Sequence, residues 1–320
     1  MVRAVVISKI GGPDVLEFTN DYKLPDIASG QVLVRQVSTS VNPVDYKVRS
    51  GRAQVLPKVL GGDVAGVIQK SKSSKWKEGD RVFALTPGFR WDTDEYGSYA
   101  EYTVSHEDWL ARVPSTVALD VAGGVPLVAL TAYQALDAGG LEPGKSRVLV
   151  HAGAGGVGHF AIQLAKAHWK AFVVTTGSTK NLEFLKELGA DEVVDYRTED
   201  FAERYKDKPF DLVIDSLGGD VEDRSYTVLT ENGTYMHIHN SNTDQKKIEA
   251  GKAWTTRKYK LTLVTPNGEQ LQIIAGHLEQ GSVKLVVDKI FSLDQIMEAH
   301  EYAENKQGRG KIVVQISKED

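Results

Sequence analysis

Apolar and polar residues between positions 147 and 264 follow two alternating patterns. Short β-rich runs, such as 147–150 and 211–215, are followed by stretches in which apolar residues recur at helical spacing, as at Leu182, Leu185 and Leu188. The other β-rich runs lie at 171–175, 192–195, 234–238 and 261–264. Alternating strands and helices predict a parallel sheet with helices on both faces, which is a doubly wound α/β domain.

The first 118 residues show strands that follow one another without intervening helices. These runs lie at 2–7, 31–38, 64–71, 80–85 and 98–104, with glycine and proline turns between them. They predict a mostly β domain. The chain ends with a short helix over 293–304 and a strand over 311–316, which we assign to the same domain. The predicted division is therefore 1–118 with 284–320, and 119–283.

A glycine-rich segment joins the first strand of the α/β domain to its first helix, predicted over 159–170. Gly153, Gly155 and Gly158 form a G-x-G-x-x-G pattern. The first glycine permits a tight turn, the second lets the backbone approach a pyrophosphate, and the third lets the helix pack close to the strand. With the free amides of the helix N-terminus, this predicts a dinucleotide site. We expect contact from the whole turn: Gly153, Ala154, Gly155, Gly156, Val157 and Gly158.

The residues after the second strand indicate which dinucleotide binds. NAD-binding folds carry an acidic residue about 20 positions past the glycines, where it bonds the ribose hydroxyls. This chain has Thr176, Gly177, Ser178 and Lys180 there, and no carboxylate before Glu183. Hydroxyls and a lysine suit a 2′-phosphate through charge-assisted hydrogen bonds, so we predict NADP. The alternative that Ser178 only caps the next helix stays open.

Composition narrows the class of protein. Of the 320 residues 41% are hydrophobic and 25% charged, as in ordinary globular proteins, and the net charge of −5 gives no reason to expect nucleic acid or an anionic membrane as a partner. No apolar run is long enough to span a bilayer. Cysteine is absent, which excludes thiolate zinc ligands, and His237 and His239 lack a third ligand in sequence, so we predict no metal. A cytoplasmic location fits, with a removed transit peptide left open.

Several ordered motifs resemble the zinc-independent medium-chain dehydrogenase/reductases, in particular their quinone oxidoreductase and enone (alkenal) oxidoreductase branch. They are N-P-V-D at 42–45, G-G-D-V-A-G-V at 61–67, G-S-Y-A-E-Y at 97–102, P-L-V-A-L-T-A-Y at 126–133, the glycine motif, L-G-A-D at 188–191 and G-K at 310–311. They cover essentially the whole chain. The alcohol dehydrogenase branch needs a Cys and a His zinc ligand in the first two motifs, and this chain has neither there.

The resemblance implies a GroES-like catalytic domain beside a Rossmann NADP-binding domain, and an NADPH-dependent reduction of quinones or α,β-unsaturated carbonyls. It places Asn42 beside the nicotinamide and substrate, and Thr131 against the nicotinamide. Lys47 replaces a tyrosine common in quinone reductases and matches the enone branch, so we expect Lys47 either to donate to the developing oxyanion or to orient the nicotinamide. The alternative is a solvated or salt-bridged surface lysine. The remaining expected cofactor contacts are Tyr196, Ser216, Leu217 and Ile238.

Aromatic residues on a polar, glycine-containing loop predict the substrate pocket. Phe89, Trp91, Tyr96 and Tyr99 cluster there, with Tyr46 nearby in the motifs, and a minor cluster under a surface loop is the alternative. The expected partner is a small electrophilic carbonyl or quinone. A homodimer through the sheet edge near 261–264 is a further expectation. Two other interpretations stay open: an enoyl-thioester reductase of the same fold, and an NADPH-binding protein without turnover.

Overall fold

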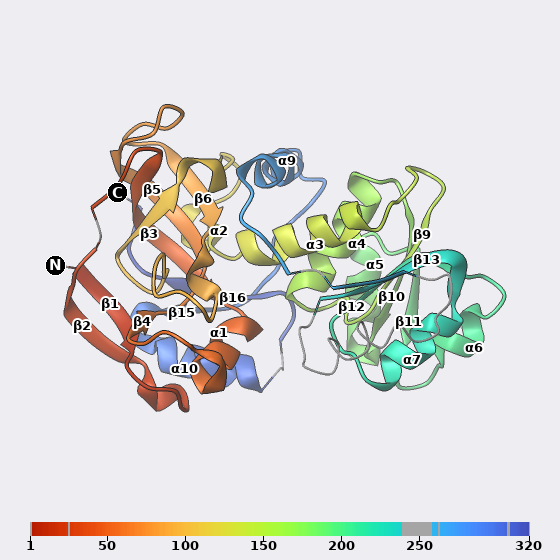
Figure 1. The fold of residues 1–320 in the computed structure, drawn as a ribbon. Helices are drawn as coiled ribbons and strands as arrows, with labels where there is room; N and C mark the ends of the chain where they lie inside the picture. Colours follow the sequence, from red (N-terminus) through yellow and green to blue (C-terminus); the bar gives the residue numbers. More distant parts are fainter. Residues whose placement is uncertain (1, 25, 239–257, 262, 306–307, 320) are drawn as a thin grey trace. The chain divides into compact units, whose positions relative to one another are not determined.

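The computed structural model describes residues 2–24, 26–238, 258–261, 263–305 and 308–319, and the chain divides into two compact units (Figure 1). The first comprises Met1–Leu130, Thr265–Gly281 and Leu285–Asp320, and the second comprises Thr131–Val264 and Ser282–Lys284. The sequence placed the division at 118 and 284. The difference arises because α2 (Leu119–Ala122) packs on β3 and α9 (Gly268–Glu279) packs on β8, and both strands belong to the first unit.

The first unit is built from two mostly antiparallel sheets. A small sheet has the strand order β2-β1-β4, and a seven-stranded sheet has the order β15-β16-β3-β5-β6-β8, with β7 paired to β3. The strands are β1 (Val2–Ile7), β2 (Glu17–Tyr22), β3 (Gln31–Val41), β4 (Lys58–Val59), β5 (Asp63–Ser71), β6 (Arg81–Leu85), β7 (Tyr102–His106), β8 (Leu110–Arg112), β15 (Val287–Ser292) and β16 (Lys311–Gln315). This architecture confirms the predicted GroES-like domain.

Short helices connect these strands. Besides α2 and α9 they are α1 (Pro43–Lys47), α10 (Ile296–Glu304), η1 (Pro13–Val15), η2 (Val48–Arg52), η3 (Pro87–Phe89), η4 (Glu107–Trp109) and η6 (Leu293–Gln295). Helix α1 begins directly after β3, because Pro43 takes its first position and the carboxylate of Asp45 accepts the backbone N–H of Asn42 at 2.7 Å. A core of β1, β16 and α10 side chains joins the C-terminal segment to the first unit.

The second unit is a six-stranded parallel sheet with the order β11-β10-β9-β12-β13-β14. This is the strand order of Rossmann folds, with its reversal between β9 and β12. The strands are β9 (Arg147–Val150), β10 (Phe172–Gly177), β11 (Glu192–Asp195), β12 (Phe210–Asp215), β13 (Leu229–His237) and β14 (Lys258–Leu261). The doubly wound domain is therefore confirmed, and β14 lies at an edge of the described sheet.

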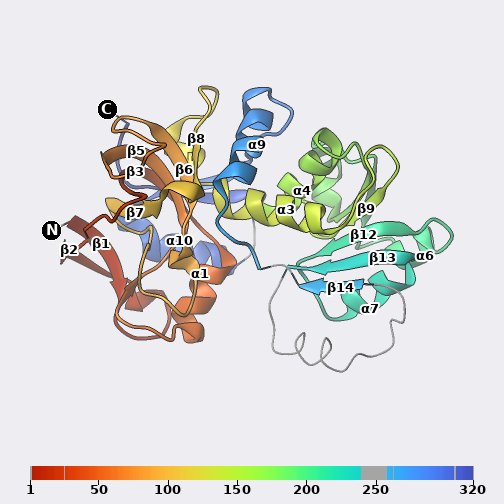
Figure 2. The same cartoon turned by 45° about the horizontal axis from the view of Figure 1, so that its top comes forward.

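Helices cover both faces of this sheet (Figure 2). They are α3 (Pro126–Ala138), α4 (Gly156–Ala167), η5 (Thr179–Asn181), α5 (Leu182–Glu187), α6 (Phe201–Tyr205) and α7 (Asp220–Thr227). Helices α4 and α5 share a face, because Ile162 and Leu185 both approach Gly153. An aromatic-rich cluster that includes Phe201 and Tyr226 packs α6 and α7 against Tyr235 on the other face.

Some predicted elements are shifted or were missed. The segment predicted as a strand over 98–104 enters β7 only at Tyr102, because Ser98 and Tyr99 donate their backbone N–H groups to Leu60. Strand β2 was not predicted, since its sequence, EFTNDY, is polar and its side chains are mostly exposed. Within the described residues, no helix has the length and apolar character that crossing a membrane requires.

Candidate functional site

The glycine turn of the second unit has the geometry that its motif predicts. A Cβ atom added at Gly153 would lie 2.1 Å from Oγ1 of Thr175, and one at Gly158 would lie 2.4 Å from the carbonyl oxygen of Ala152. At Gly155 an added Cβ would meet only that carbonyl oxygen, at 3.3 Å. The protein itself therefore requires the first and third glycines, whereas at the second a Cβ would make one tight contact.

Helix α4 begins directly after Gly155, the second glycine of the turn. Gly155 is its N-cap residue and contributes no side-chain cap to the first turn. The first-turn N–H groups of a helix have no partner within the helix, and they carry the positive end of its dipole. The turn therefore fits a pyrophosphate, with the backbone of Gly155, Gly156 and Val157 as its cradle.

A buried histidine that the sequence analysis missed supports the turn. Nδ1 of His151 lies 3.2 Å from Oγ1 of Thr176, and Nε2 lies 2.9 Å from Oγ of Ser225. The Thr176 hydroxyl also accepts the N–H of Ala152 at 3.3 Å, which holds Ala152 at a left-handed φ of 53°. Burial lowers the pKa of His151 to about 4, so the ring is neutral near pH 7. The sequence did carry a signal for this residue, because His151 is a polar residue that directly follows the apolar run 148–150.

The ends of β10 and β11 lie side by side. The backbone N–H of Tyr196 donates to the carbonyl oxygen of Gly177 at 3.2 Å, and the Tyr196 side chain is 59% exposed. Lys180 is exposed as well, whereas Ser178 is buried and its hydroxyl accepts the amide of Asn181 at 3.2 Å. The Ser178 hydroxyl does not cap the following turn. The structure thus brings together Gly177 and Tyr196, with Lys180 exposed nearby in sequence.

The end of β12 forms a tight turn that presents two predicted contacts. Oδ1 of Asp215 accepts the N–H of Leu217 at 2.8 Å, and Oδ2 accepts the N–H of Gly218 at 3.0 Å and the hydroxyl of Tyr235 at 2.5 Å. Ser216 and Leu217 are exposed as a result. Ile238 follows β13 and is half-buried, and its N–H donates to the backbone carbonyl oxygen of Asp215. Asp215 therefore shapes the turn.

Asn42, in the first unit, lies in a fully buried polar cluster. Its Oδ1 accepts from Nζ of Lys311 at 2.5 Å, and its Nδ2 donates to Oδ2 of Asp63 at 2.7 Å and to Oγ of Ser40 at 3.3 Å. Both amide hydrogens are thus used inside the domain. The amide has no spare hydrogen for a substrate oxygen in this structure, whereas Lys47, on the last turn of α1, is half-buried and reaches solvent.

A second chain of buried polar groups leads away from α1. Oδ2 of Asp45 accepts the hydroxyl of Tyr99 at 3.2 Å, that hydroxyl lies 3.1 Å from Nε2 of His300, and Nδ1 of His300 lies 3.1 Å from Nη1 of Arg49. Arg49 pairs with Glu304 near the surface. Burial raises the pKa of Asp45 to about 7 and lowers the pKa of His300 to about 3.

The aromatic residues predicted to line a pocket contact different neighbours. Tyr99 is completely buried with its hydroxyl bonded, so we leave it out of the proposed pocket. The Tyr96 ring packs edge-on against Trp109 at 5.3 Å, and Trp91 packs against the β1–α10 core. Phe89 is buried beside Gly62. Only the half-buried residues Tyr46, Trp91 and Tyr96 retain surface that a substrate could reach.

Thr131 lies within α3, which begins at Pro126. Its side chain is 6% exposed. No group of three or more His, Cys, Asp or Glu residues with metal-binding geometry occurs in the part of the chain that the structure describes, and His239 lies outside that part.

Comparisons with known proteins agree with both domains. A family model described as alcohol dehydrogenase GroES-like domain matches residues 28–115, and one described as zinc-binding dehydrogenase matches residues 188–314. The chain is 38% identical to 2-methylene-furan-3-one reductase of Solanum lycopersicum and 37% identical to the chloroplastic NADPH-dependent alkenal/one oxidoreductase of Arabidopsis thaliana. Each alignment covers 98% of this chain and 79% of the relative.

A solved structure extends the match to three dimensions. The quinone oxidoreductase from Coxiella burnetii has a TM-score of 0.88 and 33% identity, over 99% of both chains. The predicted motifs, the two matched domains and this identity along nearly the full length lead to one assignment. The chain belongs to the medium-chain dehydrogenase/reductases, in their quinone and enone (alkenal) oxidoreductase branch.

Proposed function

We propose that this protein is an NADPH-dependent oxidoreductase that reduces α,β-unsaturated carbonyls, with quinones as an overlapping class of acceptor. The observation that carries the proposal is the glycine turn, whose second glycine begins α4 without a side-chain cap, so that the first-turn N–H groups can bind a pyrophosphate. Its relatives are named for the reduction of alkenals, enones, a furanone and quinones.

The residues present fit NADP. Gly155, Gly156 and Val157 would hold the pyrophosphate through backbone amides, and Lys180 with Tyr196 would face the 2′-phosphate at the ends of β10 and β11. No carboxylate ends β10, which removes the usual partner of an unphosphorylated ribose. Bound NADPH would supply the hydride. The remaining contacts in the proposal are Gly153, Ala154, Gly158, Thr176, Gly177, Ser178, Ser216, Leu217 and Ile238.

Lys47 is the proposed catalytic donor. Hydride addition to an enone places negative charge on the carbonyl oxygen, and a cationic donor beside that oxygen stabilises the transition state. Asn42 is saturated by its buried partners, so in this proposal it fixes the start of α1 while Lys47 reaches the substrate. Thr131 on α3 would contact the nicotinamide, and Tyr46, Trp91 and Tyr96 would contact the substrate.

The proposed setting is the cytoplasm, because a cysteine-free chain fits a reducing compartment. We also propose a homodimer through the sheet edge near 261–264, where β14 is the last strand of the described sheet. Gel filtration with light scattering tests the dimer, and a monomer across a wide concentration range would reject it.

The test follows NADPH absorbance, with NADH as control, against a 2-alkenal, a short enone, an enoyl thioester and a quinone. We expect turnover with the alkenal or enone, and a preference for NADPH that Lys180→Ala weakens. Lys47→Met should lower kcat about 100-fold, whereas Lys145→Met, which changes an 80% exposed lysine, should not. Thioester-dominated turnover would favour an enoyl-thioester reductase. NADPH binding without turnover would favour a cofactor-binding protein.

A further inference from the structure

Asp63 joins two segments that are far apart in the sequence. Its Oδ2 accepts the side-chain amide of Asn42, the residue at which α1 begins. Its Oδ1 accepts the backbone N–H of Leu127, in the first turn of α3, at 2.6 Å. A carboxylate at the N-terminal turn of a helix also meets the positive end of the helix dipole. One fully buried carboxylate therefore fixes the starts of both helices.

Lys311 supplies the opposite charge from the last strand. It is 2% exposed, and its Nζ donates to Oδ1 of Asn42 and to the carbonyl oxygen of Val41 at 3.4 Å. Burial lowers the pKa of Lys311, while the carboxylates of Asp63 and Asp45 act in the opposite direction. The Asn42 amide thus bridges a buried cation and a buried carboxylate, and its orientation is fixed at both ends.

Such a cluster needs a reason beyond stability. Burying charges costs solvation free energy, and apolar replacements of similar size are often equally stable. What charges with directional bonds add is a defined geometry, because the Asn42 amide accepts from the ammonium through its oxygen and donates to the carboxylate through its nitrogen. Helix α1, which is fixed in this way, carries Lys47 five residues after Asn42.

We propose that Asp63 and Lys311 are positioning residues for hydride transfer: through Asn42 and the first turn of α3 they hold α1, and with it Lys47, at one fixed place. The inference rests on the proposed function, since Lys47 is its donor. Neither Asp63 nor Lys311 touches the substrate in this scheme. A displacement of about 1 Å at a reacting group can lower the rate by about 100-fold, so loosening the cluster should act on kcat.

The test compares Asp63→Asn, Lys311→Met and the double variant with Asp80→Asn. Asp80 is a matched control, because it is also a buried carboxylate of the first unit, 6% exposed, but it pairs with Arg112 on β8. We expect each single variant to lower kcat at least about tenfold, with the KM for NADPH within about threefold. The kcat of the double variant should be no lower than that of the less active single variant, because the two residues act as a unit. Asp80→Asn should lower the melting temperature and leave kcat unchanged.

Crystal structures of Asp63→Asn and Lys311→Met give a readout independent of activity, and α1 should be shifted in both. Unchanged kcat with an unmoved α1 would overturn the inference, as would losses of kcat that simply add in the double variant. If Asp63→Asn does not fold, Lys311→Met alone decides by the same criteria. A wild-type protein without turnover would defeat the proposed function only, and the position of α1 would still decide the inference.

Discussion

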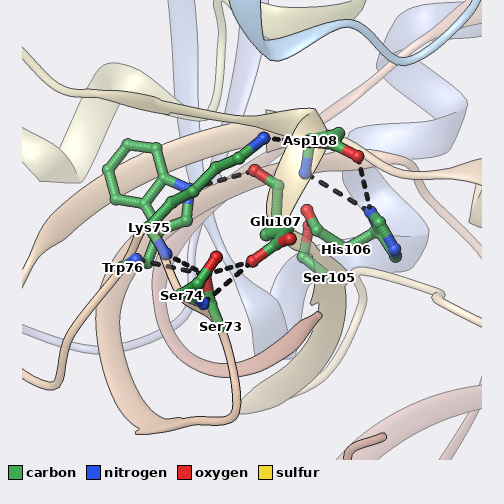
Figure 3. A network of polar contacts seen from close by, with 8 residues as sticks. All are labelled: Ser73, Ser74, Lys75, Trp76, Ser105, His106, Glu107 and Asp108. Carbon is green, nitrogen blue, oxygen red and sulfur yellow. Dashed lines mark hydrogen bonds and ion pairs between the residues drawn. The ribbon is translucent and has the colours of Figure 1, made fainter. Parts of the chain in front are cut away.

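Two polar networks of the first unit use the same kinds of bonds in opposite surroundings. In the network of Figure 3, Oε2 of Glu107 accepts the hydroxyl of Ser73 at 2.6 Å and the N–H of Ser74 at 3.1 Å, which ties the β5–β6 connection to η4. Lys75 pairs with Asp108 beside it, and both side chains are more than half exposed. In the other network Asp63 makes a similar number of bonds, but every partner lies away from solvent.

The difference between the networks lies in what replaces a lost bond. Around Glu107 water can take the place of any missing donor. The network therefore shapes a loop, but no single residue in it contributes much to the free energy of unfolding. Asp63 and its partners are buried, so removal of one group leaves another unpaired in the interior. Exposed polar networks are therefore tolerant, and buried ones are sensitive to a single atom. The predictions below test this contrast.

The largest effect is expected for Asp63→Ala. The change removes the acceptor of the Asn42 amide and the Leu127 N–H, and it takes away the larger of the two carboxylate interactions that favour the Lys311 cation. We expect the free energy of unfolding to fall by about 3–5 kcal/mol, measured by urea denaturation. A loss below about 1 kcal/mol would mean that water reaches the cluster, and the contrast with Glu107 would fail.

Asp45→Asn should change the pH dependence of stability. The pKa of Asp45 is about 7 in the folded protein against an ordinary value of 3.8, because burial disfavours the charged form. The folded state therefore holds the proton more tightly, and this group's contribution to stability falls as the pH rises from about 4 to about 7. Asparagine does not titrate, so the free energy of unfolding of the variant relative to the wild type should rise across that window. The rise should reach up to about 4 kcal/mol by pH 8.

The measurement for this variant is urea denaturation at pH 5, 6, 7 and 8. A difference in the free energy of unfolding between wild type and variant that stays constant over this range would contradict the prediction. It would mean that Asp45 stays charged in the interior, with its buried Oδ1, which has no hydrogen-bond partner among the described residues, solvated in some other way.

His300→Gln should act in the opposite direction on the acid side. Burial lowers the pKa of His300 from 6.5 to about 3. Between these two pH values the unfolded state therefore binds a proton at this ring and the folded state does not. Stability should fall as the pH drops below 6.5, by about 2 kcal/mol at pH 5 from this group alone. Glutamine can keep a bond to Tyr99 without titrating. The variant should therefore lose less stability between pH 7 and pH 5, and an equal loss in both proteins would exclude His300 as the cause.

The smallest effect is expected for Glu107→Gln in the exposed network. The amide oxygen can still accept from Ser73 or Ser74, and water supplies the rest. We expect the melting temperature to stay within about 2 °C of the wild type at both low and high salt. A drop of more than about 6 °C would show that this surface network is as sensitive as the buried one.

The sequence predicted those parts of the molecule whose chemistry is local. The glycine turn could be predicted with the steric need for Gly153 and Gly158, because strand, turn and helix are contiguous there. Asp63 and Lys311 each stood in a motif that carried the family resemblance, yet their meeting at Asn42 could not be inferred, because Lys311 lies 269 residues after Asn42 in the chain. Tyr99 was misassigned for the same reason: its partner His300 lies 201 residues away.

Lys311 also sets an order of events during synthesis. The second unit ends at Lys284, so all of its strands have been made before β15 and β16 emerge from the ribosome. The first unit contains residues from the start of the chain but needs these late strands to cover its core and to neutralise Asp63. Domains usually fold in the order in which they are made. Here the described strands of the nucleotide-binding unit precede β15 and β16, so we expect that unit to fold first and the first unit to be completed only after β16 has been made.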